Sequence, residues 1–276
     1  MRHPGQTRTI LMLVLPALGF LVIFFLIPLA YIFLGTFRSE AGNLTLQRYI
    51  ALFSDPIFWT VYKRTLYLGT VVTVIAAVLA YPTAYLISRM AVGRRSILMA
   101  LVIMPLMTNP VARTFAWLVV LGRFGLINRL LTLLGLISKP LRLIYTENAI
   151  LVGLVHLFMP LMILTLVSAM ENIPADLEEA AQSLGANRLN TFLHVILPLS
   201  SDGLILGGTL VFTGSITAYV TPAILGGTRV LVLATLLYQR SLVLLDWGSA
   251  TVIAIVMLLS TLVVYRLLRT FRPKMV

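Results

Sequence analysis

Six long runs of apolar residues, separated by shorter polar stretches, dominate the sequence. Each run is long enough to cross a lipid bilayer, which takes ~20 apolar residues in a helix that rises about 1.5 Å per residue. The pattern therefore predicts an all-α polytopic membrane protein with six transmembrane helices. The predicted spans are residues 10–37, 65–90, 96–121, 148–170, 198–220 and 247–269.

The first run, the third run and a further apolar stretch at residues 231–245 bear on the number of membrane spans. The first run is too long for a cleavable signal peptide, so we expect it to be a retained membrane helix. The third run is expected to be broken by Pro105 and Pro110, which neighbouring helices can tolerate. Residues 231–245 resemble a seventh span, but Gln239, Arg240 and Asp246 cut that run to less than a bilayer thickness.

The residue patterns of two connecting segments predict how those segments lie. Residues 126–136 predict a short amphipathic helix that lies at a membrane interface. The connection at residues 221–246 is long and moderately apolar, so it either re-enters the protein interior or lies along the surface.

The composition agrees with a lipid environment. Hydrophobic residues make up 59% of the 276 residues, charged residues only 11%, and the mean hydropathy is +1.00. A soluble domain carries about 25% charged residues, so this chain has too little polar surface for water. The formal charge is +12, but the basic residues punctuate the apolar runs and fit anionic head groups better than nucleic acid.

Lysine and arginine counts do not settle the orientation in the membrane. With the N-terminus in the cytoplasm, ten basic residues fall on that side and eleven on the other. An even number of spans places both termini on one side, and the positive-inside rule leaves open which side that is.

The connection at residues 171–198 reads ENIPADLEEAAQSLGANRLNTFLHVILP. Pro174 suits a first helical turn, Gly185 suits a left-handed helix end, and Asn187 can cap a second short helix. The small and apolar residues on one face of the first helix are Leu177, Ala180, Ala181 and Leu184. The pattern predicts a helix–turn–helix that projects from the membrane. Its polar face is acidic, which favours a protein partner over anionic lipid.

In its spacing this segment resembles the EAA loop of ABC importer permeases, which has Glu-Ala-Ala, three residues, Gly, nine residues, then Ile-x-Leu-Pro. The one departure is Val195 at the isoleucine place. The resemblance implies a type I ABC importer permease fold with one permease domain over residues 1–276. It also implies that residues 171–197 are a cytoplasmic loop that docks on an ATPase and passes its motion to the membrane helices. The coupling residues so implied are Glu178, Glu179, Ala180, Ala181, Leu184, Gly185 and Pro198.

Three further stretches resemble spermidine/putrescine-type permeases. They are residues 215–227, residues 246–248, and residues 105–109 together with Arg113. This resemblance implies a small solute, with a polyamine such as spermidine or putrescine as the first expectation. Another small solute of the same transporter class stays open, such as an opine, an amino-acid-like compound, a phosphonate or a metal-related solute.

The partners follow from what the chain lacks and what it resembles. There is no G-x-x-x-x-G-K-[ST] loop to hold phosphates, so ATP and Mg²⁺ are expected on a separate cytoplasmic ATPase dimer. We expect no catalytic residue, cofactor or metal on this chain. The resemblance further implies a second permease subunit, expected to be a different chain, and a periplasmic or extracellular substrate-binding protein. It places the chain in the bacterial inner membrane with both termini in the cytoplasm.

Residues that contact the solute are harder to single out. Ammonium groups are met by carboxylates or aromatic faces, and each residue of that kind has an equally good structural explanation. The substrate-path candidates are Asn109, Tyr219, Asp246 and Trp247, with Glu147 as a further carboxylate. Hydroxyls on the fifth span are expected to bond back to the preceding helical turn.

Arg113 and His156 also lie within predicted spans, at residues 96–121 and 148–170. Arg113 is a functional candidate because an intramembrane charge is costly, although its side chain could instead reach the interface. A cation near the path is unfavourable for a cationic solute. His156 has no second ligand at metal-binding spacing, so we expect it to pack.

Two other classes of function fit the sequence less well. A secondary transporter or channel needs ionisable groups in its spans, and the spans are nearly free of acids. A membrane-embedded enzyme needs clustered His, Asp or Glu, which nine scattered acids do not provide.

Overall fold

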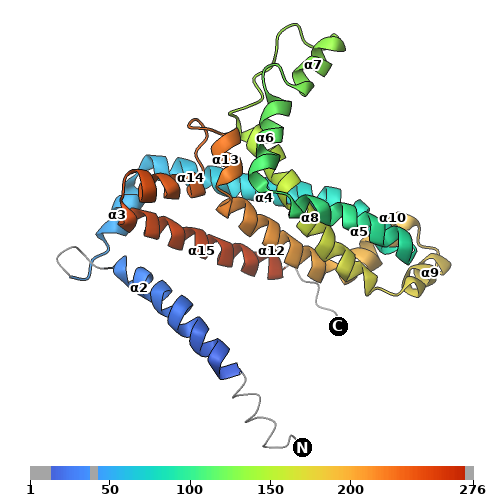
Figure 1. The fold of residues 1–276 in the computed structure, drawn as a ribbon. Helices are drawn as coiled ribbons and strands as arrows, with labels where there is room; N and C mark the ends of the chain where they lie inside the picture. Colours follow the sequence, from blue (N-terminus) through green and yellow to red (C-terminus); the bar gives the residue numbers. More distant parts are fainter. Residues whose placement is uncertain (1–13, 38–42, 271–276) are drawn as a thin grey trace, which may run out of the picture. The chain divides into compact units, whose positions relative to one another are not determined.

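The computed structural model describes residues 14–37 and 43–270, and these residues form an all-α fold (Figure 1). The described chain divides into two compact units. The first contains the residues up to Phe58 together with Leu237–Val256, and the second contains Trp59–Leu236 together with the residues from Met257 onward. The cavity and the helix–turn–helix described below both lie within the second unit.

The first unit contains an N-terminal helix, a short helix and a π-helical turn, together with parts of three further elements. Its N-terminal helix runs over Val14–Gly35, passes a π-helical turn at Val22–Leu26, and ends as α2 (Ile27–Gly35). A short α3 (Gln47–Ser54) follows, and a second π-helical turn spans Gln239–Val243. The elements that cross from one unit to the other are α4 (Pro56–Ser88), α14 (Leu233–Tyr238) and α15 (Trp247–Thr270).

The second unit contains most of the helices. In chain order they are α5 (Val92–Met107), α6 (Pro110–Leu121), α7 (Leu126–Leu133), α8 (Glu147–Glu171), α9 (Ala175–Ser183), α10 (Arg188–Thr191), a π-helical turn at Phe192–Ile196, α11 (Leu197–Leu199), α12 (Ser201–Thr217) and α13 (Val220–Leu225). In Figure 1, α9 and α10 lie at one end of this unit, while α6, α7 and α13 lie towards the other.

Five of the six predicted membrane spans are confirmed, one of them as a bent pair, while the candidate in the third place is Pro110–Leu133 instead of residues 96–121. Within the described residues, five helices are long and apolar enough to cross a bilayer, and a sixth span results if a bent pair counts as one. That pair is Arg188–Leu199 and Ser201–Thr217, which meet at 68° just after Pro198. The α4 helix begins at Pro56, earlier than the expected span at 65–90, and its 33 residues make it longer than a bilayer is thick.

The third predicted span is where the structure differs. Instead of one helix over residues 96–121, the chain forms α5 and α6 with a break at Thr108 and Asn109. A residue before proline is pushed out of the helical region, and Asn109 accordingly has φ −62° and ψ 125°. Its side-chain oxygen accepts a hydrogen bond from the backbone N–H of Val111 at 2.7 Å and so caps α6. The expected break is therefore found before Pro110, while Pro105 lies inside α5.

The two connections are also resolved. A helix is found where the amphipathic one was expected at residues 126–136, since α7 covers Leu126–Leu133, but it belongs to the candidate span Pro110–Leu133. Much of the 221–246 connection re-enters the interior, because Thr221, Leu225 and Leu233 are buried in the second unit. No seventh span is found at residues 231–245 in the described chain.

Close packing between α8 and α12 depends on glycine. A Cβ atom on Gly203 would lie 2.7 Å from the carbonyl oxygen of Thr165, and one on Gly207 would lie 2.7 Å from the sulfur of Met162. Small residues let helix backbones approach closely in membranes. Gly203 and Gly207, which are four residues apart, therefore serve packing within the chain.

We expect Gly207→Ala to lower the midpoint of thermal unfolding of the detergent-solubilised protein. The added methyl group overlaps the sulfur of Met162, and overpacking of this kind costs about 1–3 kcal/mol. Gly208→Ala is the matched control on the next residue, since its Cβ would lie at an ordinary 3.6 Å from Leu268. Equal midpoints for the two variants would show that this helix contact is not tight.

Candidate functional site

The acidic connection folds as the predicted helix–turn–helix. After α9, Gly185 adopts φ +90°, a left-handed conformation that suits glycine. The N–H of Gly185 donates to the carbonyl of Gln182 at 2.9 Å, and the N–H of Ala186 donates to the carbonyl of Ala181 at 3.0 Å. These two bonds form a Schellman motif, which closes the helix. Asn187 then caps α10 by accepting a hydrogen bond from the N–H of Asn190 at 2.8 Å.

Most of the predicted coupling residues lie on the outside of this segment. Leu184 is 89% exposed and Leu189 is 65% exposed. Glu179, Ala180 and Gly185 are also exposed, while Ala181 and Pro198 are half-buried. Exposed leucines beside small residues form a surface that a protein partner can cover.

Glu178 is the exception, because it faces into the protein. The residue is only 8% exposed, and its carboxylate accepts a hydrogen bond from the hydroxyl of Tyr85 at 2.8 Å. The same carboxylate forms an ion pair with Arg89, and Arg89 also donates to the carbonyl of Ile173 at 3.1 Å. These contacts tie α9 to the end of α4.

A second contact ties the bend at Ser200 to the same helix. The hydroxyls of Tyr81 and Ser200 lie 2.9 Å apart, and the ring of Tyr81 packs edge-on against Phe192 at 5.5 Å. Tyr81, Tyr85 and Arg89 are spaced by four residues and so share one face. We call these three residues the α4 stripe. Its contacts join the end of α4 both to α9 and to the bend at Ser200 before α12.

A cavity lies elsewhere in the second unit. Its volume is about 410 Å³, and it lies where α6, α8, α12 and α13 meet. Tyr219, one of the predicted solute residues, lines it together with Phe158 and Arg113. The remaining lining residues are Leu106, Pro110, Leu157, Leu161, Gly214, Thr217, Ala218, Val220 and Thr221.

The electrostatic potential differs between the two sides of the cavity. The last turn of α12 contributes Gly214 and Thr217, and the carbonyl end of a helix carries partial negative charge that favours cations. The first turn of α6 contributes Pro110 and Arg113, where the helix dipole is positive. A solute in this cavity therefore meets a favourable wall for ammonium groups on one side and an unfavourable wall on the other.

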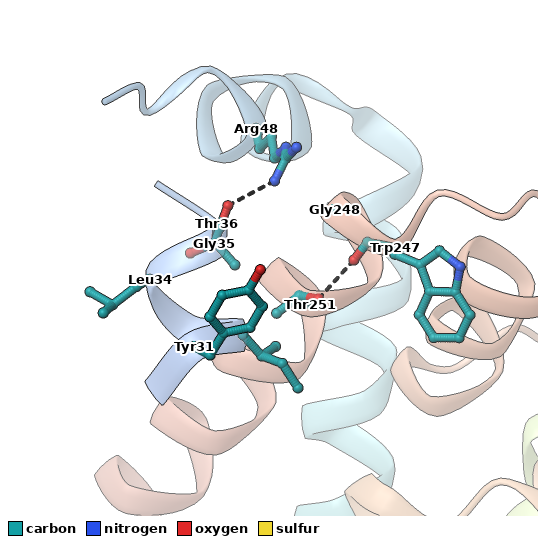
Figure 2. A pocket seen from close by; sticks show the side chains of 9 residues that line it. Tyr31, Leu34, Gly35, Thr36, Arg48, Trp247, Gly248 and Thr251 are labelled. Atoms are coloured by element: carbon teal, nitrogen blue, oxygen red, sulfur yellow. Dashed lines mark hydrogen bonds between the residues drawn. The ribbon is translucent and has the colours of Figure 1, made fainter. Parts of the chain in front are cut away.

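The other predicted solute residues are placed elsewhere. Asn109 caps α6 and is exposed. Asp246 and Trp247 belong to the first unit, where Trp247 lines a pocket of about 580 Å³ with Tyr31, Arg48 and Thr251 (Figure 2). In that pocket Arg48 donates to the carbonyl of Gly35 at 3.0 Å, and the hydroxyl of Thr251 donates to the carbonyl of Trp247 at 2.7 Å.

The contacts of Asp246 are those of a helix cap. Its carboxylate accepts a hydrogen bond from the N–H of Ser249 at 3.0 Å and lies 3.8 Å from Arg240. Burial alone would raise the pKa of Asp246, but the Ser249 hydrogen bonds and the charges of Arg240 and Arg48 outweigh it and lower the pKa below 3.8. The ionised Asp246 carboxylate therefore stabilises the folded protein above pH 3.8, and this stabilisation is lost as the pH falls through the lowered pKa. At neutral pH Asp246 is ionised and unsuited to carry protons.

We expect Asp246→Asn to leave the KM for solute uptake within about twofold of the unchanged protein. Asparagine keeps the cap, and the Arg240 pair is partly exposed, so its loss costs about 0–1 kcal/mol. Asp246→Leu removes the cap as well and is the comparison variant for thermal unfolding. A tenfold rise in KM for Asp246→Asn, with unchanged stability, would assign this carboxylate to the solute instead.

Other polar groups in the second unit also have structural partners. Glu147 accepts a hydrogen bond from Nε of Arg64 at 2.7 Å. The indole N–H of Trp117 donates to Nδ1 of His156 at 3.1 Å, as expected of a packed histidine. The hydroxyls that bond back to the carbonyl four residues earlier, each at 2.7 Å, include those of Thr209, Ser215 and Thr217.

The geometry can be compared with known proteins. Residues 82–276 match the family described as binding-protein-dependent transport system inner membrane component. The chain belongs to this family. The permease is 34% identical over 253 residues to the spermidine/putrescine transport system permease protein PotB of Haemophilus influenzae, covering 89% of this chain and 88% of that one. It is 32% identical over 272 residues to the protein of the same name from Escherichia coli, covering 95% and 98%.

Solved structures show the same fold. The permease matches a chain in the crystal structure of a bacterial alginate ABC transporter in complex with alginate pentasaccharide-bound periplasmic protein. The TM-score is 0.80 at 16% identity, with 98% of this chain and 96% of that chain covered. The permease is therefore a multi-pass inner-membrane transport protein with the ABC importer permease fold.

Sequence reasoning missed the α4 stripe of this permease. The signal was present as two tyrosines and an arginine at intervals of four near the end of a span. Their partner Glu178 lies about ninety residues further along, at a separation of 89 positions from Arg89. No local pattern links the two segments.

Proposed function

We propose that this permease forms half of the translocation path of an ATP-driven importer for a polyamine such as spermidine or putrescine. The observation that carries the proposal is the match, over most of both chains, to relatives whose names state spermidine/putrescine transport. A separate ATPase dimer supplies the free energy, a second permease chain completes the path, and a substrate-binding protein delivers the solute.

The cavity offers contacts that suit a polyamine. Ammonium groups are stabilised over aromatic faces, which Phe158 and Tyr219 provide, and near the carbonyl end of α12. Weak contacts of this kind also suit a transporter, because the solute must leave the site as readily as it enters. Of the residues singled out from the sequence, Tyr219 is the one we place on the path.

The α4 stripe suggests how motion reaches the spans. We place the α9–α10 segment in the cytoplasm, with Leu184 and Glu179 against the ATPase and both termini on the same side. When the ATPase dimer closes, α9 moves, and the Glu178 contacts draw the end of α4 with it. The Tyr81 contact at Ser200 couples the bend before α12 to the same movement, so α4 and α12 move together.

The test is solute uptake by the complete transporter in proteoliposomes. The permease, its second permease chain, the ATPase and the binding protein are reconstituted, and radiolabelled spermidine or putrescine is supplied on the binding-protein side. We expect accumulation that requires ATP on the opposite side. The matched control uses the same vesicles with a nucleotide analogue that the ATPase cannot hydrolyse.

Two results would contradict the proposal. Equal uptake with and without ATP would remove the ATP-driven mechanism. ATP hydrolysis that is stimulated by the loaded binding protein, with no polyamine accumulation, would keep the mechanism but assign another solute.

A further inference from the structure

Arg113 is a partly buried cation without a partner in the described part of the chain. Its Nε and Nη1 atoms are buried, and neither has a hydrogen-bond partner. The residue is the fourth of α6, so the positive end of the helix dipole adds to its cost. A guanidinium removed from water in this way is unfavourable unless a carboxylate or another acceptor completes it.

The acids of this chain are engaged elsewhere. None of the residues that line the cavity is acidic. Three described acids, Asp176, Glu179 and Asp202, lie on α9 or in the first turn of α12, and Glu40 lies outside the described residues. The described acids that form ion pairs are Asp55 and Asp246 with Arg240, Glu147 with Arg64, Glu171 with Arg95, and Glu178 with Arg89.

None of the described acids pairs with Arg113, so a partner on another chain would complete it. A polyamine is itself a cation, so it would be repelled by Arg113 rather than pair with it. Arginine forms bidentate pairs with carboxylates, and its planar guanidinium is suited to partly buried contacts between chains. Since this permease supplies half of the path, the facing wall of the cavity belongs to the second permease.

We propose that Arg113 forms an ion pair with a carboxylate of the second permease chain at the wall of the solute cavity. The inference rests on the proposed function, because it takes the solute to be a cation and the path to be shared by two chains. Arg113 then acts as a positioning residue. It fixes a carboxylate of the second chain beside Tyr219 and Phe158, where negative charge serves a cationic solute.

The first experiment is charge reversal and rescue in the complete transporter. Arg113→Glu places two like charges together, and we expect spermidine uptake to fall at least tenfold. Changing each Asp and Glu in the membrane spans of the second permease to Arg, one at a time, should restore at least half of the uptake at a single position. Arg113→Lys keeps the charge and should retain more uptake than Arg113→Gln. Arg123→Glu is the matched control, since that exposed arginine lies on the ring of Phe124.

The second experiment does not depend on the identity of the solute. This chain has no cysteine, so Arg113→Cys introduces its only thiol. A second cysteine replaces, one at a time, each Asp and Glu in the membrane spans of the second permease. Mild oxidation of membranes should then cross-link the two permease chains at a single one of these positions.

Three outcomes would overturn the inference. Neither rescue nor cross-linking at any acid of the second permease's spans removes the ion pair. A lower KM for spermidine in Arg113→Glu means that Arg113 faces the solute directly. Protection of Arg113→Cys from thiol labelling by a carboxylate-bearing solute assigns Arg113 to that solute. If the unchanged transporter moves no polyamine, the proposed function fails, while the cross-link still tests the contact between chains.

Discussion

Glu178→Gln is expected to lower ATP-driven uptake at least tenfold while ATP hydrolysis by the complex continues. The substitution removes the charge that compensates Arg89, which is only 24% exposed, and hydrogen bonds to charged groups contribute about 1.5–3 kcal/mol. Once α9 is released from the end of α4, the ATPase can cycle without moving the spans. The measurement is the ratio of spermidine taken up to ATP hydrolysed in proteoliposomes.

Two further variants grade the effect of breaking the Glu178 contacts. Tyr85→Phe removes one neutral donor and should cost about 1 kcal/mol, so uptake should fall only modestly. Asp176→Asn removes an exposed carboxylate from the same helix and should leave the ratio unchanged. If Glu178→Gln instead prevents the ATPase from co-purifying with an intact transporter, Glu178 contacts the ATPase and the α4 tether is wrong.

Gly185→Val is expected to reduce uptake at least tenfold without affecting membrane insertion. No atom lies within 4 Å of a Cβ built on Gly185, so valine meets no steric obstacle there. The cost comes from its φ of +90°, since left-handed backbone costs an L-residue about 1–2 kcal/mol and β-branched residues tolerate it least. The turn between α9 and α10 should open, and the exposed face that carries Leu184 should lose its shape. Uptake and ATPase co-purification are measured together.

The chain provides a matched control for this backbone effect. Gly135 ends α7 with φ +70°, has the same pair of Schellman hydrogen bonds, and also has no atom within 4 Å of a built Cβ. Gly135→Val therefore imposes a similar strain outside the coupling segment and should leave most uptake intact. Gly185→Asn, which tolerates left-handed backbone, should retain at least half. Comparable losses in both valine variants would mean that the effect is general destabilisation.

Local signals in the sequence predicted the fold of the α9–α10 segment well. Gly185 as a left-handed helix end and Asn187 as a cap depend only on neighbouring residues, and both were found as expected. The break between Pro105 and Pro110 was predictable for the same reason, because proline acts on the residue before it and on its own missing N–H. The start of α4 was not, since residues 56–64 are polar enough to lie outside a span and still continue its helix.

Tertiary partners were beyond the sequence. Glu178 and Glu179 are adjacent acids in the same motif, yet one is tied to Arg89 and the other is exposed. Asp246 was a reasonable solute ligand by composition, while its contacts with Ser249 and Arg240 favour a cap. The cost of a charge at Arg113 could be predicted, but the burial of its nitrogen atoms required the arrangement of α6 against α13 and α8.

The central claim is that the α9–α10 segment faces the cytoplasm and is covered by the ATPase. Leu184→Cys tests it most directly, because this side chain is 89% exposed and becomes the only thiol of the chain. A membrane-impermeant maleimide should label Cys at this position from the cytoplasmic side alone, in vesicles of known orientation, and bound ATPase should slow the labelling at least tenfold. Labelling from the opposite side, or labelling that the ATPase does not slow, would contradict the account.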